Sequence, residues 1–124
     1  MDFSKARCLY KAGKTEEAER TLRSFRNQWQ VEDELWGRAG WLLGRIQEED
    51  ARPQEGLAFL EEVLTVFQSG DLHEACQFWR GQCLAMLERH EKAQEVFSRL
   101  MDAFAQSMRF RQYDLNRSVL RSVL

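Results

Sequence analysis

The sequence predicts an all-α fold built from antiparallel helix pairs. The chain of 124 residues has one proline, Pro53, and seven glycines, whereas a β-sandwich or barrel of this length needs many tight turns rich in these residues. Apolar residues recur at spacings of three and four, as they do in amphipathic helices. These segments come in pairs joined by short polar turns, which favours a single domain over residues 1–124.

The first predicted pair lies within about residues 2–30. Apolar residues over 3–12 indicate the first helix, and Gly13 ends it. We expect Thr15 to cap the second helix, because a side-chain oxygen there can accept a bond from a free backbone N–H. Its apolar side follows at Ala18, Leu22 and Phe25.

The second predicted pair lies within about residues 33–69. Its first helix carries Trp36, Gly40 and Leu43, and the stretch 48–52 forms a polar turn. Pro53 is expected in the first turn of the next helix, where its missing N–H is not needed.

The third predicted pair lies within about residues 71–104, and a capping helix follows over about 107–124. Asp71 and Glu74 have the spacing of a capping box at the start of this pair. No glycine or proline marks the end of its second helix, and we expect a break near residues 106–109.

Small residues repeat along the chain and indicate close helix contacts. Ala6 aligns with Gly40 at an offset of 34 and with Gly81 at an offset of 75. A second small residue follows in each copy, at Ala18, Gly56 and Ala93. The middle copy then requires a four-residue insertion at the turn around 49–52. Such periodicity is typical of stacked helical repeats.

The stretch Leu9-Tyr10-Lys11-Ala12-Gly13-Lys14-Thr15-Glu16-Glu17-Ala18 resembles the tetratricopeptide repeat, or TPR. The resemblance implies a right-handed solenoid of three antiparallel helix pairs plus the capping helix. It also implies a non-catalytic module for protein–protein interaction, an adaptor or chaperone, whose first helices line a concave groove.

By analogy with that family, a partner segment contacts nine groove residues. These are Phe3, Arg7, Tyr10, Lys11, Trp41, Arg45, Phe78, Gln82 and Met86. The expected ligand is a protein or peptide segment, either an apolar helix or an extended strand, with acidic residues that meet the cations. Gly37 and Gly44 flank Trp41 and could leave its indole open beside a trough; core packing of Trp41 is the alternative.

A second reading assigns self-association to the C-terminal helix. Leu115, Val119, Leu120 and Val123 would form the contact in a homodimer. The apolar end of the chain also fits a regulatory domain cut from a larger protein.

Composition and residue spacing argue against a nucleic-acid-binding protein, a membrane protein, a disulfide-rich protein and a metalloprotein. The chain has 18 basic and 20 acidic residues, so nucleic-acid binding gains no general support. Apolar runs fall far short of the roughly 20 residues that span a bilayer. Three cysteines form no disulfide framework and fit a reducing cytoplasm. His73, Cys76, Cys83 and His90 spread too far along one helix to share a metal. We expect no cofactor, no metal and no enzymatic activity.

Overall fold

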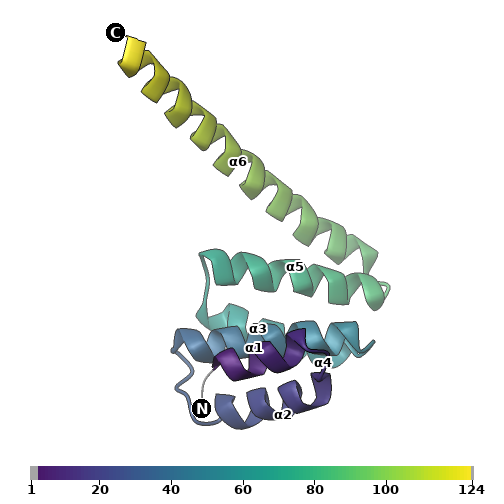
Figure 1. The fold of residues 1–124 in the computed structure, drawn as a ribbon. Coiled ribbons are helices and arrows are strands. Elements are labelled where there is room, and N and C mark those ends of the chain that lie inside the picture. Colours follow the sequence, from purple (N-terminus) through teal and green to yellow (C-terminus); the bar gives the residue numbers. More distant parts are fainter. Residues whose placement is uncertain (1–2, 124) are drawn as a thin grey trace.

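The computed structural model describes the backbone of residues 3–123 and the side chains of residues 3–106. The described residues form six helices and no strand (Figure 1). These are α1 (Phe3–Lys11), α2 (Thr15–Arg26), α3 (Glu34–Glu49), α4 (Pro53–Val66), α5 (Asp71–Met86) and α6 (His90–Val123). The predicted all-α fold is therefore confirmed.

The same turn joins the two helices of each pair. At the end of α1, the Lys14 N–H donates to the Leu9 carbonyl at 2.9 Å and the Gly13 N–H donates to the Tyr10 carbonyl at 3.1 Å. This is the Schellman arrangement, which satisfies carbonyls left free at a helix end. The matching bonds run from Arg52 to Gln47 and from Ala51 to Glu48 after α3, and from Arg89 to Leu84 and from Glu88 to Ala85 after α5.

The turns correct the predicted alignment of the repeats. The left-handed residue of each turn is Gly13, Ala51 or Glu88, at φ values of 82°, 61° and 61°. The middle repeat therefore follows the first at an offset of 38, and the turn around 49–52 contains no insertion. The extra residues lie in the loop 27–33 before α3.

This alignment makes Gly44, rather than Gly40, the equivalent of Ala6. A Cβ atom added to Gly44 would lie 2.6 Å from Leu60 of the paired helix. At the equivalent position in the third repeat, a Cβ atom on Gly81 would lie 2.8 Å from Phe97. The second and third pairs thus pack a small residue of the first helix against a large residue of the second, which fits the close packing of protein interiors.

Gly40 lies at a different contact between helices. A Cβ atom there would lie 2.5 Å from Val63 and 3.0 Å from the Arg26 guanidinium. The close helix approach predicted at Gly40 is confirmed, although its place in the repeat was wrong.

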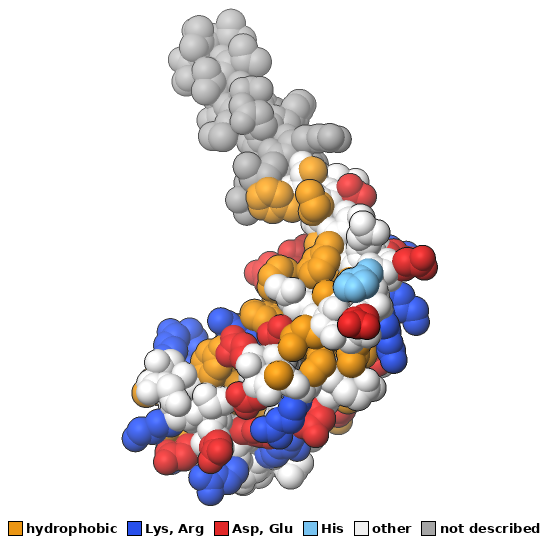
Figure 2. All heavy atoms as spheres, turned by 90° about the vertical axis from the view of Figure 1, so that its right-hand side faces the viewer, with side chains coloured by type: hydrophobic (Ala, Val, Ile, Leu, Met, Phe, Trp, Pro, Cys, Tyr) orange, Lys and Arg blue, Asp and Glu red, His pale blue; other side chains and the backbone are white. Residues whose placement is uncertain are grey.

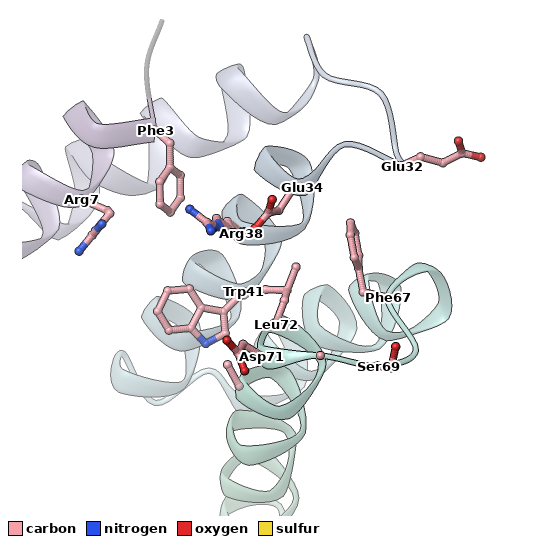
Figure 3. A pocket seen from close by; sticks show the side chains of 12 residues that line it. Phe3, Arg7, Glu32, Glu34, Arg38, Trp41, Phe67, Ser69, Asp71 and Leu72 are labelled. Carbon is pink, nitrogen blue, oxygen red and sulfur yellow. Dashed lines mark hydrogen bonds and ion pairs between the residues drawn. The ribbon is translucent and has the colours of Figure 1, made fainter. Parts of the chain in front are cut away.

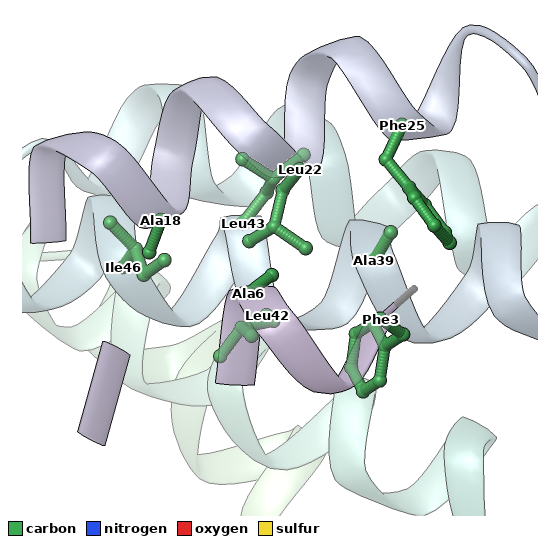
Figure 4. Packing of buried hydrophobic residues seen from close by; sticks show 9 residues of the cluster. All are labelled: Phe3, Ala6, Ala18, Leu22, Phe25, Ala39, Leu42, Leu43 and Ile46. Atoms are coloured by element: carbon green, nitrogen blue, oxygen red, sulfur yellow. The ribbon is translucent and has the colours of Figure 1, made fainter. Parts of the chain in front are cut away.

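Two buried clusters hold the helices together. The first joins α1, α2 and α3 (Figure 4) and consists of Phe3, Ala6, Ala18, Leu22, Phe25, Ala39, Leu42, Leu43 and Ile46. The second joins α3 to α6 and consists of Trp36, Leu57, Leu60, Val63, Cys76, Cys83, Leu84, Ala93 and Val96. Because α3 contributes to both, the middle repeat connects the core from end to end.

The predicted helix starts are partly correct. Pro53 begins α4 as expected. Thr15 is the first helical residue of α2 rather than its cap, and Asp71 likewise follows a capping glycine, Gly70. A side chain caps α3, where the Asp33 carboxylate accepts a 3.0 Å bond from the Leu35 N–H.

The last helix also differs from the prediction. The break expected near residues 106–109 does not occur, and α6 runs unbroken through 34 residues. A separate capping helix over 107–124 therefore does not form. Figure 1 shows α6 starting beside the end of α5 and then extending away from the other helices. No proline or glycine follows Gly81, so the backbone meets no helix breaker.

Candidate functional site

A pocket of about 640 Å³ opens between α1, α3 and the start of α5 (Figure 3). Its apolar lining consists of Phe3, Trp41, Phe67, Leu72 and Ala75, and its polar lining includes Arg7, Glu32, Glu34, Arg38 and Asp71. Three of the predicted groove residues, Phe3, Arg7 and Trp41, thus come together in it. The walls match the usual character of a binding pocket, mainly apolar with a few polar groups.

An aromatic residue occupies the same position in each first helix. The turn alignment makes Phe3, Trp41 and Phe78 equivalent. Phe3 is buried and Trp41 half-buried, and both line the pocket. Phe78 is 42% exposed and lies outside the pocket, with its ring 6.0 Å from that of Phe97 on α6. The aromatic row is therefore divided between the pocket and the α5–α6 edge.

Trp41 is not placed by the two glycines as predicted. The space beside Gly37 is filled by Phe67 and Leu72, each 2.7 Å from where its Cβ atom would lie. Leu60 fills the space beside Gly44. The expected trough between the glycines is absent, because both face the neighbouring helices. The open space instead lies between Trp41, Phe3 and the start of α5 (Figure 3).

The indole of Trp41 has an unused hydrogen-bond donor. Its Nε1 atom is buried and has no partner among the described residues. A buried donor without a partner loses its bond to water and gains nothing in return. Trp41 therefore brings an unsatisfied polar group to the pocket wall.

The pocket rim carries both signs of charge. Arg38 pairs with Glu34 at 2.7 Å. Within the described part of the chain, Arg7 is an exposed cation without an ion pair, and Asp71 is an exposed anion without one. The rim can therefore orient a ligand that carries charges of its own.

Arg45 is held beside the pocket by a carboxylate and aromatic rings. Its Nε donates to Glu49 at 3.0 Å, and the Tyr10 hydroxyl donates to the same side chain. The guanidinium lies 5.3 Å from the ring centre of Tyr10 and 5.0 Å from that of Trp79, a cation–π arrangement. Glu49 thus already neutralises the cation that was expected to meet an acidic partner.

The surroundings of Tyr10 change the pKa of its phenol. Burial, followed by its hydrogen bond to Glu49, raises the pKa of Tyr10 from 10.0 to about 12. The neutral hydroxyl is therefore retained across the physiological range, and it keeps Glu49 oriented toward Arg45.

The other predicted groove residues are more scattered. Lys11 is exposed without an ion pair among the described residues, Gln82 is half-buried, and Met86 is 43% exposed. Neither Gln82 nor Met86 lines the pocket. Residues predicted for self-association, Leu115, Val119, Leu120 and Val123, have side chains outside the described part of the structure.

Sequence reasoning missed several side chains of this region. These are Glu49, Phe67, Leu72 and Trp79. Alignment of the three turns would have given the correct place of Trp41 and Arg45 in the repeat. No short-range pattern marks Phe67 or Leu72, because they reach α3 from the loop between α4 and α5 and from the start of α5.

The buried thiols do not suit nucleophilic chemistry. Burial raises the pKa values of Cys76 and Cys83 to about 12 each, so the thiolate that would act as nucleophile hardly forms. No group of three or more potential ligands among the described residues could hold a metal ion. Among the described helices, none has the length and apolar character needed to cross a bilayer.

The model of the tetratricopeptide repeat family matches residues 3–29 and 70–107, more than half of the chain. The chain belongs to the TPR family. No curated protein and no solved structure matched it. TPR repeats generally mediate protein–protein interactions, and the family is typically non-catalytic.

The two matched segments correspond to α1–α2 and to α5 with the first half of α6. The pair α3–α4 lies outside the match. Its turn geometry nevertheless equals that of both matched repeats, and its Gly44–Leu60 contact resembles the Gly81–Phe97 contact between α5 and α6. The middle pair therefore has the same helix–turn–helix geometry as the matched repeats.

Proposed function

We propose that this TPR protein is a non-catalytic adaptor or chaperone that holds a peptide or helix of a partner protein. The observation that carries the proposal is the 640 Å³ pocket between α1, α3 and α5, lined by Phe3, Trp41 and Phe67. The first helices of a TPR array line its concave side, and this pocket lies between all three. Aromatic side chains are enriched among residues that dominate binding energy.

The side chains of the pocket indicate which chemical groups a ligand would carry. An apolar side chain of the partner would enter between Phe3 and Trp41. A main-chain carbonyl beside it would accept the free Trp41 Nε1–H. Acidic residues of the partner would meet Arg7 and Lys11, the exposed cations of α1 that have no ion pair among the described residues. An amphipathic helix or an extended segment could supply this pattern.

A cytoplasmic location fits the same proposal. The structure keeps Cys8, Cys76 and Cys83 as free thiols, the state expected where glutathione and thioredoxin keep cysteines reduced.

The test is selection of binding peptides from a random library on the purified full chain, followed by titration against variants. We expect selected peptides to contain an apolar residue with acidic neighbours. Trp41→Ala should weaken their binding at least about tenfold, because it removes an anchor of the pocket. Arg7→Glu should weaken the binding of acidic peptides by a similar factor, because the new carboxylate repels them.

Arg20→Glu is the matched control for the charge change. Arg20 is exposed on α2 and does not line the pocket, so its reversal should leave peptide affinity unchanged. Equal affinities for the native chain and for both pocket variants would reject this site. Similar losses for Arg7→Glu and Arg20→Glu would show only a general charge effect.

A further inference from the structure

A strip of apolar side chains leaves the core along α6. Phe97 is half-buried against Phe78, whereas Met101 is 71% exposed and Phe104 is 68% exposed. Spacings of four and three place these three residues on one side of the helix. Figure 2 shows hydrophobic side chains at the surface along this part of the molecule. We call Phe97, Met101 and Phe104 the α6 strip.

Within the described part of the chain, no other element covers the strip. The helix α6 runs for 34 residues, or about 50 Å at 1.5 Å per residue, and only its first part lies beside α5 (Figure 1). A helix normally buries an apolar side against another element. Since α6 does not bend back, its distal half cannot cover the strip of the same chain.

The sequence of α6 matches the same helix in antiparallel orientation. Apolar residues at 97, 101, 108, 115 and 119 are arranged symmetrically about Met108. In an antiparallel pair centred there, position 101 of one chain meets position 115 of the other, and position 97 meets position 119. Such self-complementarity is what a two-fold symmetric contact requires.

Charge favours the same arrangement. Residues 107–124 contain four arginines and one aspartate, a net charge of +3, whereas residues 1–106 contain 14 basic and 19 acidic residues, a net charge of −5. Antiparallel pairing places the basic end of each chain beside the first half of the other α6. Glu91 is exposed there, about one helical turn from the position that Arg121 of the other chain reaches, and it has no ion pair among the described residues.

We propose that a second copy of this chain covers the α6 strip, with the two α6 helices packed antiparallel about Met108. The pocket between α1, α3 and α5 is a separate surface, and a dimer of this kind leaves it open in both copies. The inference is independent of the proposed peptide binding.

Sedimentation equilibrium of the full chain tests the contact. We expect a mass of twice 14.7 kDa that falls on dilution. The double variant Met101→Glu/Phe104→Glu should raise the dimer dissociation constant about 100-fold or more, because it puts charge into an apolar contact. Both residues are exposed, so an unchanged circular dichroism spectrum is expected and would confirm folding.

Val31→Glu is the matched control, since Val31 is a 52% exposed apolar residue in the loop before α3. It should leave the dimer intact. A native chain that stays monomeric at all concentrations would overturn the proposal. So would a dimer that Met101→Glu/Phe104→Glu does not weaken.

Cysteine cross-linking tests the orientation, in a Cys8→Ser background that removes the exposed thiol. A short bis-maleimide should join two Met108→Cys chains. It should not join two Glu91→Cys chains, because antiparallel helices centred on Met108 hold these positions about 50 Å apart. Cross-linking at both positions would indicate a parallel pair and overturn the proposed arrangement.

Discussion

At the scale of single residues, the neighbouring side chains decide whether a charged group is available to a ligand. Arg45 looks like a free groove cation in the sequence, but Glu49 and three aromatic rings hold it. Arg7, its equivalent in the first repeat, has no ion pair among the described residues. The two arginines therefore differ in role: Arg45 stiffens the groove wall, and Arg7 is available to a ligand.

Tyr10 offers a pH-dependent test of this cluster. Its pKa rises from 10.0 to about 12 on folding. The folded state therefore holds the phenolic proton more tightly, and the resulting stability is complete below pH 10 and lost between pH 10 and 12. Tyr10→Phe should lower the free energy of unfolding by less than about 1 kcal/mol, since the side chain is only half-buried.

Urea unfolding of both proteins at about pH 9 and about pH 11.5 measures this effect. The comparison cancels lysine and cysteine titrations common to both chains. The difference between native protein and variant should shrink at the higher pH. A constant difference would mean that Tyr10 does not titrate with folding.

At the scale of helices, the repeated turn carries the most information. Its left-handed position is glycine in the first repeat but Ala51 and Glu88 in the others. A residue with a Cβ atom in this conformation is strained by roughly 1–2 kcal/mol per residue. The turn persists because its backbone bonds end one helix and place the next.

Glu88→Gly should therefore stabilise the protein by about 0.5–1 kcal/mol, after the greater freedom of glycine in the unfolded chain is subtracted. Thermal or urea unfolding measures the change. Glu91→Gly is the matched control, because Glu91 lies in the first turn of α6 and should instead lose up to about 1 kcal/mol. A loss of stability for both variants would contradict a strained turn.

At the scale of the whole molecule, Arg26 connects the first repeat to the second. It lies on α2 at 8% exposure, with its guanidinium 4.3 Å from the ring centre of Trp36 and 3.4 Å from the Glu62 carboxylate. Burial lowers the pKa of Arg26, because the loss of water disfavours its charge, while Glu62 acts in the opposite direction. Its contribution should come mainly from the volume of its side chain.

Arg26→Met should accordingly change the free energy of unfolding by no more than about 1 kcal/mol, whereas Arg26→Ala should lose about 2 kcal/mol or more by leaving a cavity. Chemical denaturation of the three proteins measures both values. Equal losses for methionine and alanine would show that the charge itself is needed to join the repeats.

The sequence by itself determined the helices, their pairing and the close helix approaches at Gly40 and Gly81. The helices depend on residues three or four positions apart, and the pairing depends on a turn between neighbours, as at Gly13. Two of the aromatic residues predicted for the groove, Phe3 and Trp41, line the pocket, whereas the trough considered between Gly37 and Gly44 is filled by other side chains.

Only the tertiary structure decided the register of the middle repeat, the contents of the groove and the course of α6. Phe67 and Leu72 fill the space beside Gly37 from distant segments, and Glu49 neutralises Arg45 next to Tyr10 and Trp79. Helical periodicity states which side of a helix is apolar. It does not state which other helix will cover that side, because this depends on how all the elements pack together.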